Sequence, residues 1–130
     1  MRPFEHLLHR HPFVMLDRAE VVEEGRHAKG IKLVSADDPA VSQAGIFPSA
    51  YVVEAMAQTS GIASGKETGS MLAGLKDIEF RGTVLTGDTL ETESIFERNF
   101  GGLYFFSCTA SVSGKRVAEG GVILYFDETA

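Results

Sequence analysis

Cysteine is almost absent from this 130-residue sequence, which contains Cys108 alone. A single cysteine cannot form an intramolecular disulfide, so the sequence is not that of a disulfide-rich secreted domain, and we expect a cytoplasmic protein. The four histidines are dispersed and have no spacing typical of zinc ligands. We therefore expect neither a metal ion nor a redox cofactor, and interpret Cys108 as a small core residue on a strand rather than a nucleophile.

Long hydrophobic runs and an excess of positive charge are also missing. No apolar stretch approaches the roughly 20 residues needed to cross a bilayer, and the N-terminal sequence MRPFEHLLHRHPF lacks the basic-then-apolar order of a secretory signal. The formal net charge is −6, and no segment concentrates Lys and Arg with aromatic residues. These features argue against a membrane or nucleic-acid partner.

The remaining composition is that of an ordinary globular chain, with 44% hydrophobic and 23% charged residues. No repeat, low-complexity segment or linker divides it, so we expect one domain over residues 1–130. Mixed apolar and polar residues predict strands over 13–25 and 27–36, and Pro and Gly predict turns over 37–48. A helix is expected from Pro48. Extended runs then predict further strands over about 72–81, 89–100, 103–113 and 116–127. This order predicts an α+β fold in which a long antiparallel sheet wraps one central helix.

The predicted helix, PSAYVVEAMAQTSGIASG (48–65), is apolar or small at most positions, which is typical of a helix buried on nearly all sides. Glu54 and Gln58 interrupt this pattern four residues apart and therefore share one face. A carboxylate in an apolar setting is suited to general acid or base catalysis, and Gln58 could hold a water or a substrate carbonyl beside it. The alternative is that Glu54 faces solvent or pairs with a basic residue across an interface.

Four motifs, LLHRHPFVMLDR, FPSAYVVEAMAQTSG, EFRGTVLTGD and SVSGKRVAEGGVILYF, resemble the hot-dog-fold 3-hydroxyacyl-acyl-carrier-protein dehydratases in order and nearly in spacing. The resemblance covers almost the whole chain. It implies a long helix wrapped by an antiparallel sheet, and a dimer whose two sheets join, with acyl tunnels at the subunit interface. It also implies removal of water from a 3-hydroxyacyl thioester of acyl carrier protein or coenzyme A, in fatty-acid or polyketide-type biosynthesis.

The resemblance also assigns roles to individual residues. Glu54 matches the catalytic carboxylate, which works with a histidine of the other subunit, and Gln58 matches the amide one turn later. The acyl thioester is expected against Ile46, Phe47, Tyr51 and Ala55. Matches to the N-terminal segment, which is mainly structural in the family, are His9, Arg10, Pro12, Asp17 and Arg18, and matches to the strand and turn before the final hairpins are Arg81, Gly87 and Asp88. Carrier docking is expected at Arg81 and Lys76, chosen from a wider set of basic residues that also includes Arg10, Arg18 and Lys66.

One family feature is missing. Family members carry Gly-His-Phe-Pro before the helix, with a catalytic histidine, whereas GIFP places Ile46 at that position. Counting back from Glu54 instead aligns Pro48 with a later proline of the family, and on either alignment the histidine is absent. Isoleucine cannot transfer a proton, so the active site is predicted to be incomplete in a dimer of this chain alone. His6, His9, His11 and His27 are interpreted as exposed or structural.

Three functions remain open. The chain could pair with a His-bearing homologue in a heterodimeric dehydratase. It could instead be a hot-dog thioesterase, in which Glu54 acts without a histidine and Gln58 positions the water. It could also bind acyl thioesters without turnover, either as a homodimer or as a heterodimer.

Overall fold

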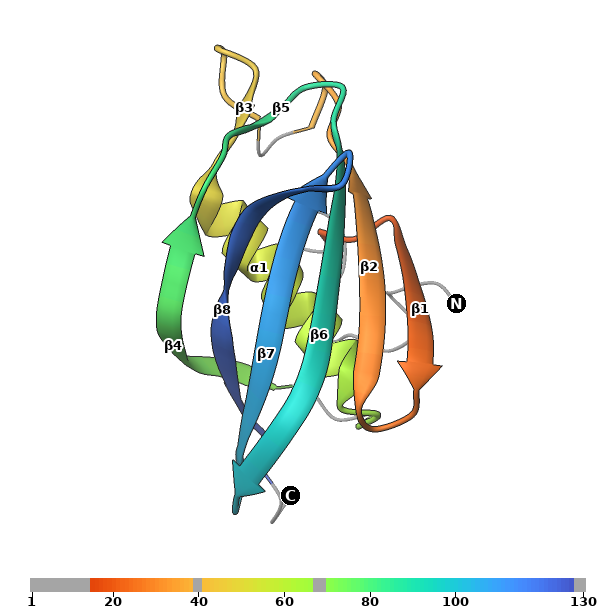
Figure 1. Cartoon of the computed structure of the whole chain (residues 1–130), viewed down its shortest axis with the longest axis vertical. Coiled ribbons are helices and arrows are strands. Elements are labelled where there is room, and N and C mark those ends of the chain that lie inside the picture. The colour runs from red at the N-terminus through yellow and green to blue at the C-terminus, as the bar shows by residue number, and fades with distance from the viewer. Residues whose placement is uncertain (1–14, 39–40, 67–69, 128–130) are drawn as a thin grey trace.

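The computed structural model describes residues 15–38, 41–66 and 70–127 (Figure 1). In chain order the elements are β1 (Arg18–Glu23), β2 (His27–Leu33), β3 (Ile46–Phe47), α1 (Ser49–Ala63), β4 (Met71–Phe80), β5 (Val84–Leu85), β6 (Thr89–Phe100), β7 (Leu103–Val112) and β8 (Lys115–Tyr125). One helix packs on a long antiparallel sheet, which confirms the α+β arrangement. Within these described residues, no helix is both long and apolar enough to cross a membrane.

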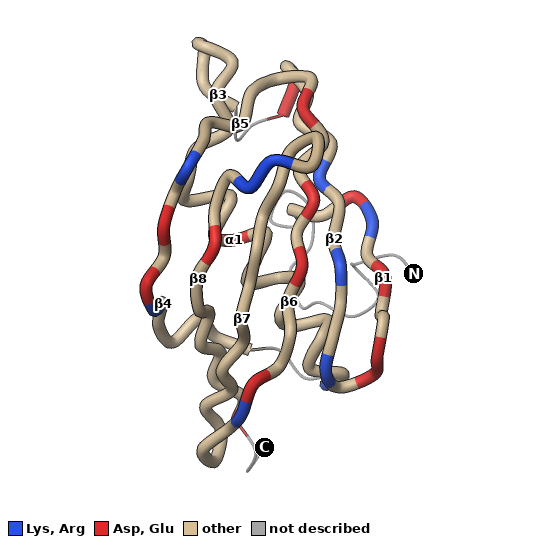
Figure 2. Tube along the Cα trace, viewed as in Figure 1, with Lys and Arg blue, Asp and Glu red and all other residues tan. Residues whose placement is uncertain are grey.

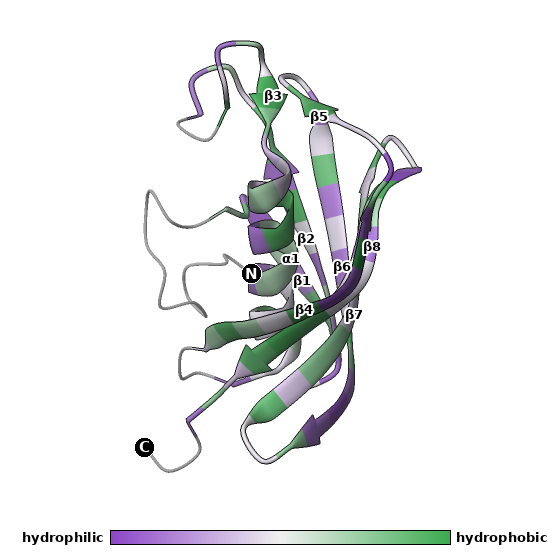
Figure 3. Cartoon of the chain, turned by 90° about the vertical axis from the view of Figure 1, so that its left-hand side faces the viewer, coloured by the Kyte–Doolittle hydropathy of each residue, from purple (hydrophilic) through white to green (hydrophobic). Residues whose placement is uncertain are grey.

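The main sheet has six strands in the order β1-β2-β6-β7-β8-β4, all paired antiparallel. Three hairpins join strands that follow one another in sequence, namely β1–β2, β6–β7 and β7–β8. The strand after the helix, β4, pairs only with β8 among the described strands and so forms one edge of the sheet. Figure 3 shows the sheet curving around one side of α1.

The helix α1 begins after Pro48, whose φ of −61° and ψ of 146° suit the residue before a first helical turn. It ends at Ala63, and Gly65 then reverses the chain with φ 70°. From Val52 to Ala63 every residue except Glu54 is buried. The prediction of a helix buried on nearly all sides is therefore confirmed for this segment.

Hydroxyl groups join α1 to the sheet at its most buried section. Thr59 Oγ1 lies 2.6 Å from Thr92 Oγ1, and Ser60 Oγ lies 2.7 Å from Ser94 Oγ. Both helical hydroxyls also donate to backbone carbonyls one turn earlier. Small hydroxyl side chains allow the helix to approach the strands closely, while leaving each buried oxygen with a hydrogen-bond partner.

Cys108 lies in this same layer on β7 and is 1% exposed, which confirms its interpretation as a small core residue. Its Sγ is 3.1 Å from Ser60 Oγ. Burial raises the pKa of the thiol from its usual value of 9.0, and the hydrogen bonds of Ser60 and Ser94 offset this only in part. The thiol is therefore neutral and enclosed.

The prediction of turns throughout residues 37–48 is wrong at its end. Ile46–Phe47 forms the short strand β3, which pairs antiparallel with β5, a second strand that the sequence pattern did not predict. Two residues are too few for an alternating pattern, and the pairing joins segments far apart in the chain. The first two strands are also shorter than predicted, because β1 and β2 cover only 18–23 and 27–33.

Candidate active site

Glu54 and Gln58 lie on adjacent turns of α1 and contact each other directly. Gln58 Nε2 donates a hydrogen bond to Glu54 Oε1 at 3.1 Å, and Gln58 Oε1 accepts one from the backbone N–H of Met15 at 2.8 Å. Gln58 is 2% exposed, whereas Glu54 is partly exposed. The amide is thus held by hydrogen bonds from both of its polar atoms, one of them to the carboxylate of Glu54.

A cavity of about 310 Å³, which we call the Glu54 cavity, opens beside this pair. Ala57 has a small side chain and Gly61 has none, which leaves space along the helix. The cavity is lined by Glu54, Ala57, Gln58, Gly61, Ser70, Met71, Leu72 and Leu124. Met71 and Leu72 belong to the edge strand β4 and are 70% and 44% exposed. A carboxylate in a largely apolar cleft can exchange a proton with a substrate or activate a water.

A second cavity of about 290 Å³, the Ile46 cavity, lies at the N-terminal end of α1. It is lined by Ile46, Phe47, Ser49, Val52, Phe80, Gly82, Thr83, Val84 and Val117. Ile46 and Phe47 are therefore together, but in a different cavity from Glu54 within one chain. Tyr51 is 38% exposed with its ring 6.0 Å from that of Phe47, and Ala55 is fully buried and lines neither cavity.

The edge strand β4 lines both cavities, one at each of its ends. Its first residues, Met71 and Leu72, line the Glu54 cavity, and its last residue, Phe80, lines the Ile46 cavity. Between them Leu75 is 47% exposed, and Phe80 itself is 48% exposed. A long edge strand with exposed apolar side chains is a typical site of pairing with another chain.

Basic residues gather near the Ile46 cavity. Arg81, the residue after β4, pairs with Glu79 at 3.0 Å and with Glu119, and Arg116 pairs with Glu119 at 3.1 Å. Figure 2 shows that the basic start of β8 lies at the end of the sheet toward which β4 runs. Arg81 was predicted as a docking residue, and the structure adds Lys115 and Arg116 near it, which follow one another in the sequence SGKR.

The other proposed basic residues lie elsewhere. Lys76 is exposed in the middle of β4. Arg18 is on β1 at the opposite edge of the sheet, and the amine of Lys66 lies 4.9 Å from the ring centre of Tyr104. Arg10 is outside the described residues, as are His9 and Pro12 of the same N-terminal motif.

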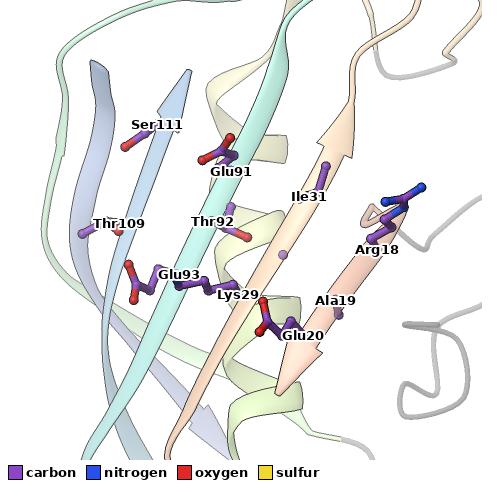
Figure 4. A pocket seen from close by; sticks show the side chains of 11 residues that line it. Arg18, Ala19, Glu20, Lys29, Ile31, Glu91, Thr92, Glu93, Thr109 and Ser111 are labelled. Carbon is purple, nitrogen blue, oxygen red and sulfur yellow. The ribbon is translucent and has the colours of Figure 1, made fainter. Parts of the chain in front are cut away.

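The largest of the described cavities, about 450 Å³, lies on the sheet face away from the helix (Figure 4). Thr92 bonds to α1, so Glu91 and Glu93, its neighbours on β6, point to the opposite face. Lys29 and Arg18 contribute positive charge to the same surface. Charges of both signs make it a poor site for an acyl chain, and we place the candidate site on the helix side.

His27 is the one histidine within the described residues. Its Nε2 lies 2.5 Å from Glu93 Oε2, and its strand β2 is separated from β4 by three other strands. It therefore does not line the Glu54 cavity, while His6, His9 and His11 lie outside the described residues. In residues 15–38, 41–66 and 70–127 no three His, Cys, Asp or Glu side chains cluster in a way that could hold a metal ion.

Comparison with known proteins places these features in a family. The model of the FabA-like domain matches residues 7–121. The chain is 36% identical over 126 residues to the 3-hydroxyacyl-[acyl-carrier-protein] dehydratase FabZ of Cronobacter sakazakii, with 88% of this chain and 83% of the relative covered. The corresponding enzyme of Erwinia tasmaniensis is 35% identical with the same coverage.

Solved structures agree with the fold. The dehydratase heterocomplex ApeI:P of Xenorhabdus doucetiae superposes with a TM-score of 0.87 at 24% identity, covering 99% of this chain and 93% of that one. A hypothetical thioesterase with coenzyme A from Streptococcus pneumoniae has a TM-score of 0.69 at 11% identity, with 85% and 87% covered. At these identities the likeness establishes the hot-dog fold.

Proposed function

This chain belongs to the FabA-like family, and from that premise we propose that it is a dehydratase-like subunit for 3-hydroxyacyl thioesters that shares its active site with a His-bearing hot-dog chain. The observation that carries the proposal is the position of Glu54. Its carboxylate is held by Gln58 beside a cavity bordered by the edge strand β4. A partner strand along β4 would close the cavity and add side chains to it.

The geometry of such a pairing follows from symmetry. A two-fold axis perpendicular to the sheet joins two β4 strands antiparallel and keeps both helices on one face. The Phe80 end of one strand then meets the Met71 end of the other. The Ile46 cavity of one chain would adjoin the Glu54 cavity of its partner, which would bring the predicted acyl-binding residues Ile46 and Phe47 to the carboxylate across the interface.

This pairing also has a favourable energy. Met71, Leu75 and Phe80 each expose about half or more of their surface in the single chain. Full burial of a large apolar side chain contributes about 1.5–3 kcal/mol, so covering these partly exposed residues would add several kcal/mol to association. Backbone hydrogen bonds along the new strand pair would fix the register.

Dehydration requires two proton transfers, and this chain supplies the group for one of them. A base removes the proton from the carbon next to the thioester carbonyl, and an acid protonates the departing hydroxyl. One C–H and one C–O bond break, a C=C bond forms, and water leaves. Protonated Glu54 would deliver its proton to the hydroxyl, while an imidazole from the partner would accept the carbon-bound proton.

We further propose that acyl carrier protein binds at the basic end of the sheet, beside the Ile46 cavity. Lys115 and Arg116 at the start of β8, with Arg81 after β4, border the Ile46 cavity through Phe80, Gly82 and Val117. A carrier that is acidic would be attracted to these charges, although Glu79 and Glu119 moderate them.

The test is to co-purify the chain with a His-bearing dehydratase relative and measure dehydration of a 3-hydroxyacyl thioester. Glu54→Ala should lower kcat/KM about 10²- to 10⁴-fold, the range for loss of a general acid or base. Glu97→Ala, which removes an exposed carboxylate from β6, is the matched control and should leave the rate unchanged. Full activity of Glu54→Ala would rule out this function.

Thioester hydrolysis is the second candidate, because the Glu54 cavity holds a carboxylate and an amide but none of the described histidines. Such a pair could activate a water without a partner's imidazole. The chain alone would then release free thiol from acyl thioesters, and Glu54→Gln would abolish the release. Acyl binding with no turnover, alone or paired, would instead identify a binding subunit.

A further inference from the structure

The two cavities of this chain differ in the chemistry that they can perform. The Glu54 cavity contains a carboxylate that can gain and lose a proton. The Ile46 cavity has only the hydroxyls of Ser49 and Thr83 as polar side chains among its described lining residues, and neither titrates near neutral pH. Within the described residues, one chain therefore carries one half-site with a proton-transferring group and one without.

The antiparallel pairing described above, on which this inference rests together with the proposed function, creates two chambers for each dimer. The first combines the Glu54 cavity of this chain with the corresponding Ile46-type cavity of the partner. The second combines the partner's helix carboxylate with the Ile46 cavity of this chain. If the partner carries a histidine at its own half-site, only the first chamber contains both a carboxylate and an imidazole.

We infer that the heterodimer has a single catalytic chamber, formed by Glu54 with the partner's histidine, and that the second chamber binds acyl chains without dehydrating them. The apolar lining of the Ile46 cavity, with Val52, Phe80 and Val117 around Ile46, is intact and suits an acyl chain. Among its described lining residues, none can exchange a proton with the substrate near neutral pH. A homodimer of this chain would contain two such idle chambers.

The decisive experiment compares the two helix carboxylates in the co-purified pair. Glu54→Ala in this chain should lower dehydration of a medium-chain 3-hydroxyacyl thioester by at least 100-fold. Alanine at the equivalent carboxylate of the partner should leave turnover within about twofold. Equal losses from both substitutions would overturn the single-chamber inference while preserving the shared site, whereas no loss from Glu54→Ala would overturn the proposed function itself.

A gain-of-function variant tests the same point from the other chamber. Ile46→His should supply the missing imidazole, raise turnover per dimer up to about twofold, and retain activity when combined with Glu54→Ala. Leu85→His is the matched control, because Leu85 pairs with Ile46 and is 46% exposed but does not line the cavity. Rescue by both histidine variants, or by the control alone, would contradict the assignment of this half-site.

Binding stoichiometry tests the idle chamber. Calorimetric titration of the wild-type pair with a saturated acyl-pantetheine amide, which cannot be dehydrated, should give two sites per dimer. Ile46→Glu places a charge in the apolar cavity and should reduce the number to one. One site in the wild-type pair would show that the second chamber does not bind acyl chains.

Discussion

Gln58 is the residue whose replacement tests the site most directly, because its hydrogen bonds to Met15 and Glu54 have separable roles. Its oxygen accepts the N–H of Met15, three residues before β1, and its nitrogen donates to Glu54. Gln58→Leu removes both bonds and leaves the buried Met15 N–H without an acceptor, a loss that typically costs about 1–3 kcal/mol. The bond to Glu54 adds less than its usual value, since water reaches the partly exposed carboxylate. We expect Gln58→Leu to lower the free energy of unfolding by about 2–3 kcal/mol.

Gln58→Glu separates the two roles. Its carboxyl group can still accept the Met15 N–H, but in this buried position beside Glu54 two negative charges would repel each other. Stability recovered relative to Gln58→Leu should therefore appear only at low pH, where one of the two carboxyl groups is protonated, and the lost activity should not return. Urea denaturation followed by circular dichroism gives the free energies, and the dehydration assay gives kcat/KM. For a chain of this size, 2–3 kcal/mol corresponds to a fall in Tm of roughly 10 °C. If Gln58→Leu unfolds within about 0.5 kcal/mol of wild type, the assigned hydrogen bonds do not fix the site.

Three further predictions concern the core and the basic end of the sheet. A Cβ on Gly30 would lie 2.7 Å from Thr92 Oγ1, so Gly30→Ala should cost about 1–3 kcal/mol in urea denaturation, whereas Gly74→Ala, whose Cβ meets nothing closer than 3.5 Å, should cost far less. Because burial raises the pKa of Cys108, the unfolded chain loses the thiol proton before the folded chain does as pH rises past 9.0. The free energy of unfolding should therefore decline above that pH, and Cys108→Ala should remove the part of this decline that the thiol causes. Arg116→Glu, at the start of β8, should weaken acyl-carrier-protein binding roughly fivefold at low salt and less at high salt. Arg98→Glu, near the C-terminal end of β6, should leave this binding unchanged.

The helix and its polar pair could be predicted because both depend on local sequence. Pro48 sets the start of α1, and a run of apolar and small residues requires burial. The four-residue spacing alone places Glu54 beside Gln58, and the structure joins them at 3.1 Å. The four C-terminal strands were also predicted close to their observed bounds, since each is an extended run of ten or more residues and turn residues separate the last three.

The parts that could not be predicted depend on contacts between distant segments. The partner of Gln58 is a backbone N–H 43 residues away, which no side-chain pattern marks. The pairing of β3 with β5 rests on two residues in each strand. Nothing in the sequence indicated that Ile46 and Phe47 lie in a different cavity from Glu54, because the separation depends on which cavity each end of β4 lines.

The separation of Ile46 and Phe47 from Glu54 has a physical explanation if β4 pairs with a second chain. Within one chain, an acyl group at Glu54 would meet Ala57, Gly61 and the exposed start of β4, with water on the open side. A partner strand would remove that water and bring an apolar wall of the Ile46 type against the carboxylate. Exclusion of water strengthens the electrostatic interaction of Glu54 with a departing hydroxyl. The same edge strand that exposes apolar side chains in the single chain would thus complete the chamber in which the carboxylate can act.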